Sequence, residues 1–503
     1  MKHSEQILRA TESIRDKRRE LEDDEWRLHY HVTAPVFWMN DPNGFSFFQN
    51  EYHLFYQHHP YSTEWGDIHW GHVKSRDLVH WEHLPHALAP SEPYDQDGCF
   101  SGSAIEKDGK LFLFYTGNRW TGKNQDTDLK QVQCIAVSED GENFTKIAEN
   151  PVISQPPEGD IHPNHFRDPK VWKQGEHYYC VLGSQTNHRV GQVLLYRSSD
   201  LLTWEFMNVA ARGKGNMGYM WECPDFFQLD GQDVLVMSPQ GVEPEGEFYH
   251  NLHQAVYALG DLNLTKGEFD FDSFHPLDYG FDFYAPQTTL DNKGRRILIA
   301  WMAMWESDMP ERKDHWAGAM TLPREIYFEN NQLKCLPVKE LESLRHDYLH
   351  FENILVEEKV TLDGLEGDSM EINVVIDAME TTQFGVKVRC NDLFTEQTIL
   401  TYDGENQLFS MNRDNSGKGP GGIRKAPLSL KNNLLNLKIF IDRSSVEVFL
   451  QEGEKVMSAR IYPGEDANGV QFFSDRKVKI VKLEKWSLGN RGGGIAGTVL
   501  VMH

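Results

Sequence analysis

Three acidic side chains stand at equivalent places in a repeated sequence pattern and could act together in catalysis. With Asn50, Gly175 and Gly231 as markers of the first, third and fourth copies, Asp41 lies nine residues before its marker, Asp168 seven and Glu222 nine. Carboxyl groups that converge in one pocket repel one another, so at least one must have a raised pKa, as a general acid requires. Asp41 beside a sugar carbon and Glu222 beside the leaving oxygen would form the carboxyl pair of a retaining glycosidase.

Aromatic and polar residues close to the three acids are typical of a sugar site. Sugars stack their C–H faces on aromatic rings and present hydroxyls to polar groups. The aromatic candidates are Trp38, Trp65, Phe100, Trp221 and Trp301, and the polar candidates are Asn40, Gln57, Ser101 and Arg167. Each has a structural alternative: a D-P-N-G turn begins at Asp41, Arg167 could pair with Asp168, and the tryptophans could be core. Their common register favours a functional pocket.

A period near sixty residues predicts how residues so far apart can meet. Copies of a Gly- or Asn-containing turn followed by an apolar, β-rich run occur at 50–57, 108–117, 174–184, 230–240 and 292–302. A weaker repeat between them is marked by Asp77, Asp140, Asp200 and Asp261. Five such units predict a five-bladed β-propeller, in which equivalent positions meet around the central axis. A β-sandwich rarely keeps such a period, and the helical pattern of a βα-barrel does not follow the copies.

The sequence changes character after residue 336, and two domains are expected for 503 residues. Alternating apolar runs at 370–377, 384–390, 437–450 and 477–488 predict the strands of an antiparallel sandwich. We therefore expect an all-β protein, a five-bladed propeller followed by a C-terminal β-sandwich. The expected segments are a helical extension (1–27), the propeller (28–336), a helix or linker (337–350), the sandwich (351–488) and a Gly-rich tail (489–503).

Composition and charge argue against several classes of protein. A net charge of −26 is unfavourable for binding nucleic acid or an anionic membrane. The N-terminal segment is charged throughout and lacks the apolar region of an export signal, while Ile7, Ile14 and Leu21 indicate a short amphipathic helix. The sequence contains no apolar run long enough to span a membrane. Six scattered cysteines without a C-x-x-C pair indicate free thiols, so a cytoplasmic location is expected.

A group of histidines raises the question of a metal site. The group contains His69, His72, His80, His83 and His86. Their spacing matches no standard zinc pattern, and their W-G-H and V-H-W contexts read as strand positions. We therefore expect no metal and no cofactor, and a small-molecule substrate as the partner. The sandwich and the N-terminal helix are candidate contact surfaces for a homo-oligomer.

Three ordered motifs carry a resemblance to a known family. WMNDPNG (38–44), FRDP (166–169) and WECPD (221–225) resemble the signature boxes of glycoside hydrolase family 32. FSGS (100–103), GFDFYAPQT (280–288) and DRSSVEVF (442–449) resemble its secondary motifs. The resemblance extends from about residue 28 to 488 and implies the same propeller-plus-sandwich fold. Within the family, the chain looks most like the bacterial intracellular sucrases and sucrose-6-phosphate hydrolases.

This resemblance implies a retaining β-fructofuranosidase with a separate role for each acid. It makes Asp41 the nucleophile, Glu222 the acid and base at the leaving oxygen, and Asp168 the stabiliser of the oxocarbenium-like transition state. Arg167 would keep Asp168 ionised, and Cys223 beside Glu222 would either tune its proton affinity or simply pack. The implied substrate-binding residues are Trp38, Met39, Asn40, Gln57, Trp65, Phe100, Ser101, Arg167, Tyr284 and Trp301.

The leaving group is left open by the sequence. Sucrose and sucrose 6-phosphate are the expected substrates; exo-acting fructan hydrolysis and fructosyl transfer are alternatives within the same machinery. An inverting five-bladed glycosidase of arabinose or xylose polymers and a non-catalytic sugar-binding propeller are the alternatives from other classes. Phosphate recognition would need Arg or Lys at the outer rim, and Arg119 and Lys123 are the candidates. The acidity of the chain is mildly unfavourable for an anionic substrate.

Overall fold

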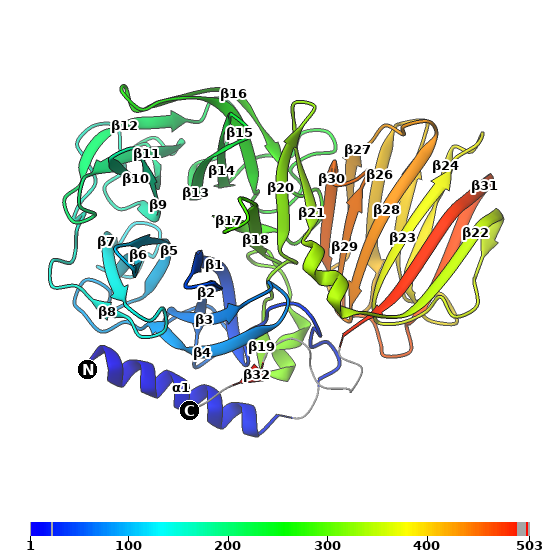
Figure 1. Ribbon diagram of the computed structural model, residues 1–503, viewed down its shortest axis with the longest axis horizontal. Helices are drawn as coiled ribbons and strands as arrows, with labels where there is room; N and C mark the ends of the chain where they lie inside the picture. Colours follow the sequence, from blue (N-terminus) through cyan, green and yellow to red (C-terminus); the bar gives the residue numbers. More distant parts are fainter. Residues whose placement is uncertain (1, 22–23, 490–498, 501–503) are drawn as a thin grey trace.

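The computed structural model describes residues 2–21, 24–489 and 499–500 and consists of two β-rich bodies side by side (Figure 1). In the first body, five sheets of four consecutive antiparallel strands surround a central axis. In the second, a ten-stranded sheet folds over one hydrophobic core. The predicted five-bladed propeller followed by a β-sandwich is therefore confirmed.

Each blade is an antiparallel meander, and the first strands of the blades contact one another around the axis. The blades are β1 (Phe37–Phe48), β2 (Glu51–His59), β3 (His69–Ser75) and β4 (Trp81–Leu88); β5 (Cys99–Lys107), β6 (Lys110–Trp120), β7 (Leu129–Ser138) and β8 (Thr145–Lys146); β9 (Phe166–Gln174), β10 (His177–Gln185), β11 (Gly191–Ser198) and β12 (Glu205–Arg212); β13 (Met220–Leu229), β14 (Gln232–Gln240), β15 (Val256–Asn263) and β16 (Glu268–Pro276); and β17 (Tyr284–Leu290), β18 (Arg296–Trp301), β20 (Arg324–Glu329) and β21 (Gln332–Pro337). The short strand β19 (Trp316–Ala317) runs parallel to β1.

The two sequence repeats have different structural causes. The apolar copies form the second strands β2, β6, β10, β14 and β18, which are almost wholly buried because neighbouring blades cover both of their faces. Three Asp residues of the weaker repeat, Asp77, Asp140 and Asp200, close turns between the third and fourth strands; the fourth, Asp261, lies within β15, where Asn263 accepts the turn hydrogen bonds instead. Asp77 accepts hydrogen bonds from the backbone N–H groups of Val79 and His80 at 3.0 and 2.8 Å. Asp200 does the same with Leu202 and Thr203. Such Asx turns explain why this position repeats as Asp.

The C-terminal domain is one continuous sheet rather than two separate ones. Its strands are β22 (Arg345–Val360), β23 (Ser369–Asp377), β24 (Gln383–Cys390), β25 (Gln397–Asp403), β26 (Leu408–Asn415), β27 (Ile423–Pro427), β28 (Leu434–Asp442), β29 (Ser445–Leu450), β30 (Lys455–Arg460) and β31 (Gly469–Leu488). The long strand β31 pairs with β24 through its first part and with β23 through its second. It therefore joins the two layers of the sandwich.

Helix α1 (His3–Arg19) and strand β32 (Val499–Leu500), the first and last elements that the structure describes, both lie against β4, the fourth strand of the first blade. The helix buries Ala10 and Ile14, and β32 pairs parallel with β4. Residues 490–498 and 501–503 of the predicted Gly-rich tail lie outside the described residues. A 3-10 helix η1 (Pro310–Asp314) precedes β19, and η2 (Lys339–Leu344) lies in the predicted linker, where β22 then begins. Among the described residues, no helix has the length and apolar character needed to cross a bilayer.

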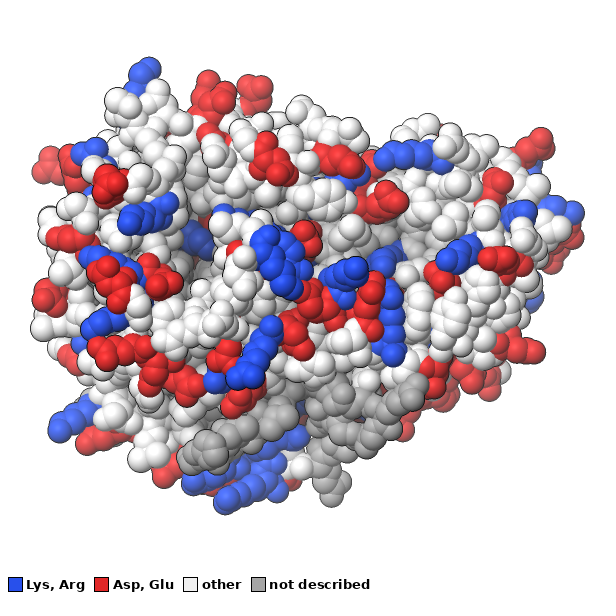
Figure 2. All heavy atoms as spheres, viewed as in Figure 1, with Lys and Arg blue, Asp and Glu red and all other residues white. Residues whose placement is uncertain are grey.

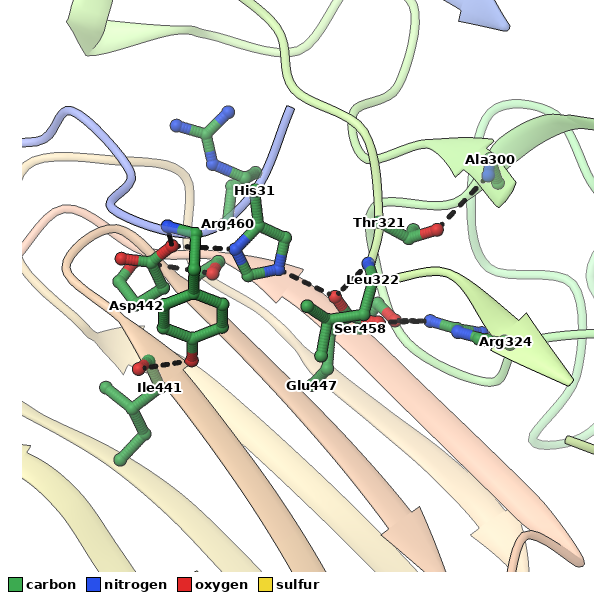
Figure 3. Close-up of polar contacts among 12 residues, drawn as sticks. His31, Ala300, Thr321, Leu322, Arg324, Ile441, Asp442, Glu447, Ser458 and Arg460 are labelled. Carbon is green, nitrogen blue, oxygen red and sulfur yellow. Dashed lines mark hydrogen bonds and ion pairs between the residues drawn. The ribbon is translucent and has the colours of Figure 1, made fainter. Parts of the chain in front are cut away.

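A buried charged network joins the two domains (Figure 3). The His31 ring, from the segment before β1, contacts Asp442 Oδ2 through Nδ1 at 2.7 Å and Glu447 Oε1 through Nε2 at 3.0 Å. Arg324 of β20 donates to Glu447 Oε2 at 2.6 Å and to Asp278 Oδ2 at 3.0 Å. Both sandwich carboxylates belong to the DRSSVEVF motif. That motif therefore fixes the sandwich to the propeller rather than contributing to the pocket.

The His31 network predicts a pH-dependent part of the stability. Burial acts to lower the pKa of His31, but its bonds to Asp442 and Glu447 outweigh burial and raise the pKa to about 9. The raised pKa means that this stabilisation is fully present below about pH 6.5 and is lost as the pH rises through about 9. We expect His31→Gln to lower the free energy of unfolding by roughly 3 kcal/mol more at pH 6 than at pH 10.

Urea unfolding of both proteins at the two pH values measures this difference. His188→Gln, a change at an exposed histidine of the propeller, is the control and should show no such pH-dependent loss. Equal destabilisation by His31→Gln at both pH values would mean that His31 is not charged in the folded protein.

Candidate active site

The first strand of each blade is involved in a β-bulge near its start. The register is interrupted between Met39 and Pro42, Phe100 and Gly102, Glu222 and Asp225, and Tyr284 and Gln287 on these strands, and between Val181 and Gly183 opposite β9. At three of these places the backbone has a positive φ, 65° at Asp168, 47° at Cys223 and 51° at Ala285. A bulge re-aims a side chain that a regular strand would point elsewhere. The repeated bulges thus turn acidic side chains into the central channel.

Asp41 on β1, Asp168 on β9 and Glu222 on β13 meet in one pocket of about 500 Å³. They come from the first, third and fourth blades, as the repeat register predicts. The Cys223 thiol joins two of them, with its Sγ 3.5 Å from Asp41 Oδ2 and 3.6 Å from Asp168 Oδ2. One sulfur atom between two carboxyl groups shows how closely these side chains converge.

Asp41 is buried and held on both oxygens. Ser101 Oγ donates to Oδ2 at 2.7 Å, and Asn40 Nδ2 donates to Oδ1 at 3.2 Å. Burial and the charge of Glu222 raise the pKa of Asp41 to about 6, although the bonds from Ser101 and Asn40 oppose the rise. Above that pH, Asp41 is an ionised and firmly oriented carboxylate.

The environment of Asp168 disfavours its charged form more strongly than that of Asp41. The Cys223 backbone N–H donates to Asp168 Oδ2 at 2.9 Å. Burial and the charge of Glu222 raise the pKa of Asp168 to about 7, against the opposing charge of Arg167. The same two aspartates, after burial, raise the pKa of the Cys223 thiol, so this group remains a neutral donor.

Glu222 is held by donors on both oxygens. Arg167 donates from Nε and Nη2 to Oε1 at 3.0 and 2.8 Å. Tyr284 donates its hydroxyl to Oε2 at 2.5 Å, and Gln240 Nε2 donates to the same oxygen at 3.1 Å. Burial acts to raise the pKa of Glu222, but the Arg167 charge and the Tyr284 hydrogen bond outweigh it and lower the pKa.

Two expected contacts are replaced by others. Arg167 pairs with Glu222 and not with Asp168, so it does not keep the Asp168 pKa low. Cys223 contacts Asp41 and Asp168 rather than the acid beside it in sequence. Neighbouring residues of a strand point to different sides, and the bulge at this point changes their directions further. Adjacency in sequence was therefore a poor guide to contact here.

The predicted substrate-binding residues fall into two groups. Those lining the pocket are Asn40, Gln57, Trp65, Phe100, Ser101 and Arg167. Those outside its lining are Trp38, Met39, Tyr284 and Trp301, each at most 3% exposed. Trp38 Nε1 donates to Asn40 Oδ1 at 2.7 Å, so this ring supports a lining residue. These four are buried behind the lining, and a contact between them and the sugar stays a prediction.

Several lining residues were not singled out from the sequence. They are Trp120, Gln131, His165, Gln185, Arg189, Tyr219, Gln240, His253, Trp305 and Glu306, among others. Gln185 and Gln240 end the second strands of their blades, near the level at which Gln57 lies on its own, so the repeat could have indicated them. Arg189 and Tyr219 lie outside the strands and carried no such signal. Arg119 and Lys123, the expected phosphate ligands, do not line the pocket.

The histidines of the first blade pair with one another. His58 Nδ1 lies 2.8 Å from His86 Nε2, and His53 Nδ1 lies 3.0 Å from His72 Nε2. Burial lowers the pKa of all four, so they are neutral at ordinary pH. Within the described part of the chain, no group of three or more His, Cys, Asp or Glu side chains is arranged to hold a metal ion.

Comparison with known proteins agrees with this geometry. Residues 31–337 match the family model described as the glycosyl hydrolases family 32 N-terminal domain, and residues 340–487 match the C-terminal one. A sucrose-6-phosphate hydrolase of Escherichia coli is 40% identical over 490 residues, covering 96% of this chain and 99% of its own. A raffinose invertase of Escherichia coli is 38% identical over 482 residues, covering 93% and 96%.

Solved structures give the same assignment. A β-fructofuranosidase of Bombyx mori, determined as a variant in complex with sucrose, matches with a TM-score of 0.85 and 38% identity, over 96% of this chain and 98% of its own. A sucrose-6-phosphate hydrolase of Lactobacillus gasseri matches with a TM-score of 0.85 and 30% identity, over 95% and 96%. The chain therefore belongs to glycoside hydrolase family 32.

Proposed function

We propose that this enzyme hydrolyses the β-D-fructofuranosyl bond of sucrose and sucrose 6-phosphate by double displacement. Asp41 attacks the anomeric carbon of fructose, and Glu222 protonates the leaving oxygen and then activates water. Asp168 binds fructose hydroxyls and stabilises the positive charge of the transition state. The propeller (28–336) carries this chemistry, and the sandwich (351–488) braces it. With all six cysteines free and buried, we place the enzyme in a reducing compartment, the cytoplasm.

The different environments of the two reacting carboxyls carry the proposal. Asp41 faces neutral donors, Ser101 and Asn40, which orient an attacking carboxylate without neutralising its charge. Glu222 is surrounded by Arg167 and Tyr284, which can stabilise it each time it gives up its proton. Retaining glycosidases need this division between a nucleophile and a group that donates and regains a proton.

The proton that Glu222 needs must reach it when the substrate binds. In the free site the pKa values are raised on Asp41 and Asp168 and lowered on Glu222, so the shared proton resides on the aspartates. Fructose hydroxyls that donate to Asp168 favour its ionised form, while a leaving oxygen beside Glu222 favours the protonated acid. Substrate binding thus moves the proton from Asp168 to Glu222.

This proton sharing predicts a narrow pH profile. We expect kcat/KM for sucrose to fall below about pH 6, where Asp41 becomes protonated, and above about pH 7, where the three carboxyls lose their last shared proton. Both apparent pKa values belong to the coupled group rather than to single residues. Initial rates between pH 4.5 and 9 measure the profile. A rate that stays constant to pH 9 would contradict the assignment of the basic limb.

Substrate and stereochemistry test the proposal directly. We expect kcat/KM for sucrose and sucrose 6-phosphate to exceed that for inulin, and proton NMR to show fructose released first as the β-anomer. An inverted first product would rule out the double displacement. Accumulation of oligosaccharides at high sucrose would instead identify fructosyl transfer as a major reaction.

A further inference from the structure

One wall of the pocket beside Glu222 is built by Tyr219 and Arg189. Tyr219 lies three residues before Glu222, and Arg189 lies in the turn between β10 and β11. The Arg189 guanidinium carbon stands 4.5 Å from the centroid of the Tyr219 ring. If Glu222 protonates the leaving oxygen, as the proposed function has it, the sugar bonded to that oxygen extends toward this wall.

The cationic groups of the pocket differ in what they are free to bind. Arg167 is occupied by Glu222. His165 is neutral, because burial and the charge of Arg167 lower its pKa to about 3. Its Nε2 donates to the Asp126 carbonyl at 2.6 Å, and its Nδ1 accepts from Arg167 at 3.0 Å. The Arg189 side chain has no hydrogen-bond or ion-pair partner among the residues that the structure describes.

The charge around Arg189 makes its position selective. Acidic and basic side chains are interspersed over the face shown in Figure 2, and the chain carries a net charge of −26, so the molecule as a whole does not attract anions. Asp126 and Glu306 also line the pocket, and neither has a cationic partner in the described part of the chain. Of the two arginines among the described residues that line the pocket, Arg189 is the one without a carboxylate partner, and it is the candidate for an anion although the Asp126 charge also acts on Tyr219.

We infer that Arg189 binds a phosphate monoester on the leaving hexose and thereby determines the preference of the enzyme for a phosphorylated substrate. Stacking on Tyr219 holds the planar fork in place, and its free N–H groups match two phosphate oxygens. A phosphate on the fructosyl side would instead meet Asp41 and Asp168, which repel it. This inference rests on the proposed function and adds the residue that recognises the phosphate of the leaving hexose.

The test compares substrates in wild type and Arg189→Gln. We expect Arg189→Gln to lower kcat/KM for sucrose carrying a 6-phosphate on its glucosyl unit by roughly 10- to 100-fold, and for sucrose by less than about threefold. For the phosphorylated substrate, kcat/KM of Arg189→Lys should lie between those of wild type and Arg189→Gln. Lysine keeps the positive charge but lacks the paired N–H groups of the guanidinium. Product inhibition should change in the same way. Arg189→Gln should weaken inhibition by glucose 6-phosphate and leave inhibition by fructose unchanged.

Lys123→Gln removes an exposed positive charge outside the pocket and is the matched control. It should leave the ratio of the two kcat/KM values within twofold of wild type. An unchanged ratio in Arg189→Gln, an equal loss on both substrates, or stronger weakening of inhibition by fructose 6-phosphate than by glucose 6-phosphate would overturn the inference. A wild-type enzyme that cleaves neither substrate would instead overturn the proposed function.

Discussion

Replacing Asp41 with asparagine is expected to lower kcat for sucrose by at least about 10⁴-fold. The amide has the shape of the carboxyl group and can still accept the hydrogen bond from Ser101 at 2.7 Å. It cannot attack the anomeric carbon, so the covalent fructosyl-enzyme does not form. Release of glucose from sucrose measures the loss, and activity within tenfold of wild type would remove Asp41 from the nucleophile role.

The same substitution should stabilise the protein, which separates loss of chemistry from loss of fold. The raised pKa of Asp41 means that its charge costs folding free energy at neutral pH. We expect Asp41→Asn to raise the free energy of unfolding by about 1–3 kcal/mol at pH 7.5. Asp77→Asn in the same blade is the control with the opposite expectation. Turnover is kept, and stability falls at neutral pH. Burial acts to raise the pKa of Asp77, but the hydrogen bonds from His80 and Val79 outweigh burial and lower the pKa, so they stabilise a charged form that an amide lacks. If Asp41→Asn is less stable than wild type, the claim that the Asp41 charge costs folding free energy at neutral pH is wrong.

The fold could be predicted because the sequence features that produce each blade repeat along the chain. Second strands such as β2 and β10 are covered on both faces, so their apolar runs recur once per blade. The Asx turns at Asp77 and Asp200 recur for a local reason, their hydrogen bonds to the following backbone. Both signals are short-range, and a single sequence contains them in full.

The contacts inside the site depend on features that a single sequence does not contain. Bulges turn Asp168 and Cys223 into the channel. A proline follows directly at four of the five bulges, as Pro42, Pro169, Pro224 and Pro286, but it marks a bulge without fixing which partner each side chain meets. Arg167 consequently reaches Glu222 of the next blade instead of its own neighbour. Arg189 is brought to the pocket by a hairpin turn whose direction only the assembled propeller sets. Prediction therefore succeeded for which carboxyls meet and failed for which partners hold them.

Glu222→Gln is the second large effect that we expect, and it depends on the leaving group. For sucrose, the loss of the proton donor should lower kcat by roughly 10²- to 10⁴-fold. For an aryl β-D-fructofuranoside, whose phenolate leaves without protonation, the first step should survive. The result is a rapid burst of phenol equal to the enzyme concentration, followed by slow release of fructose, because no base activates water. Stopped-flow absorbance measures the burst.

The residual reaction of Glu222→Gln should also reveal the charge coupling in the site. The Glu222 charge raises the pKa of Asp41, second only to burial, so its removal should move the acidic limb of the aryl-substrate profile below pH 6. Glu245→Gln, on the exposed loop after β14 of the same blade, should change neither the burst nor the limb. A burst as slow as the sucrose reaction would show that Glu222 does more than move a proton. An unshifted limb would show that burial alone sets the Asp41 pKa, and the proton exchange between aspartates and Glu222 would then lose its physical basis.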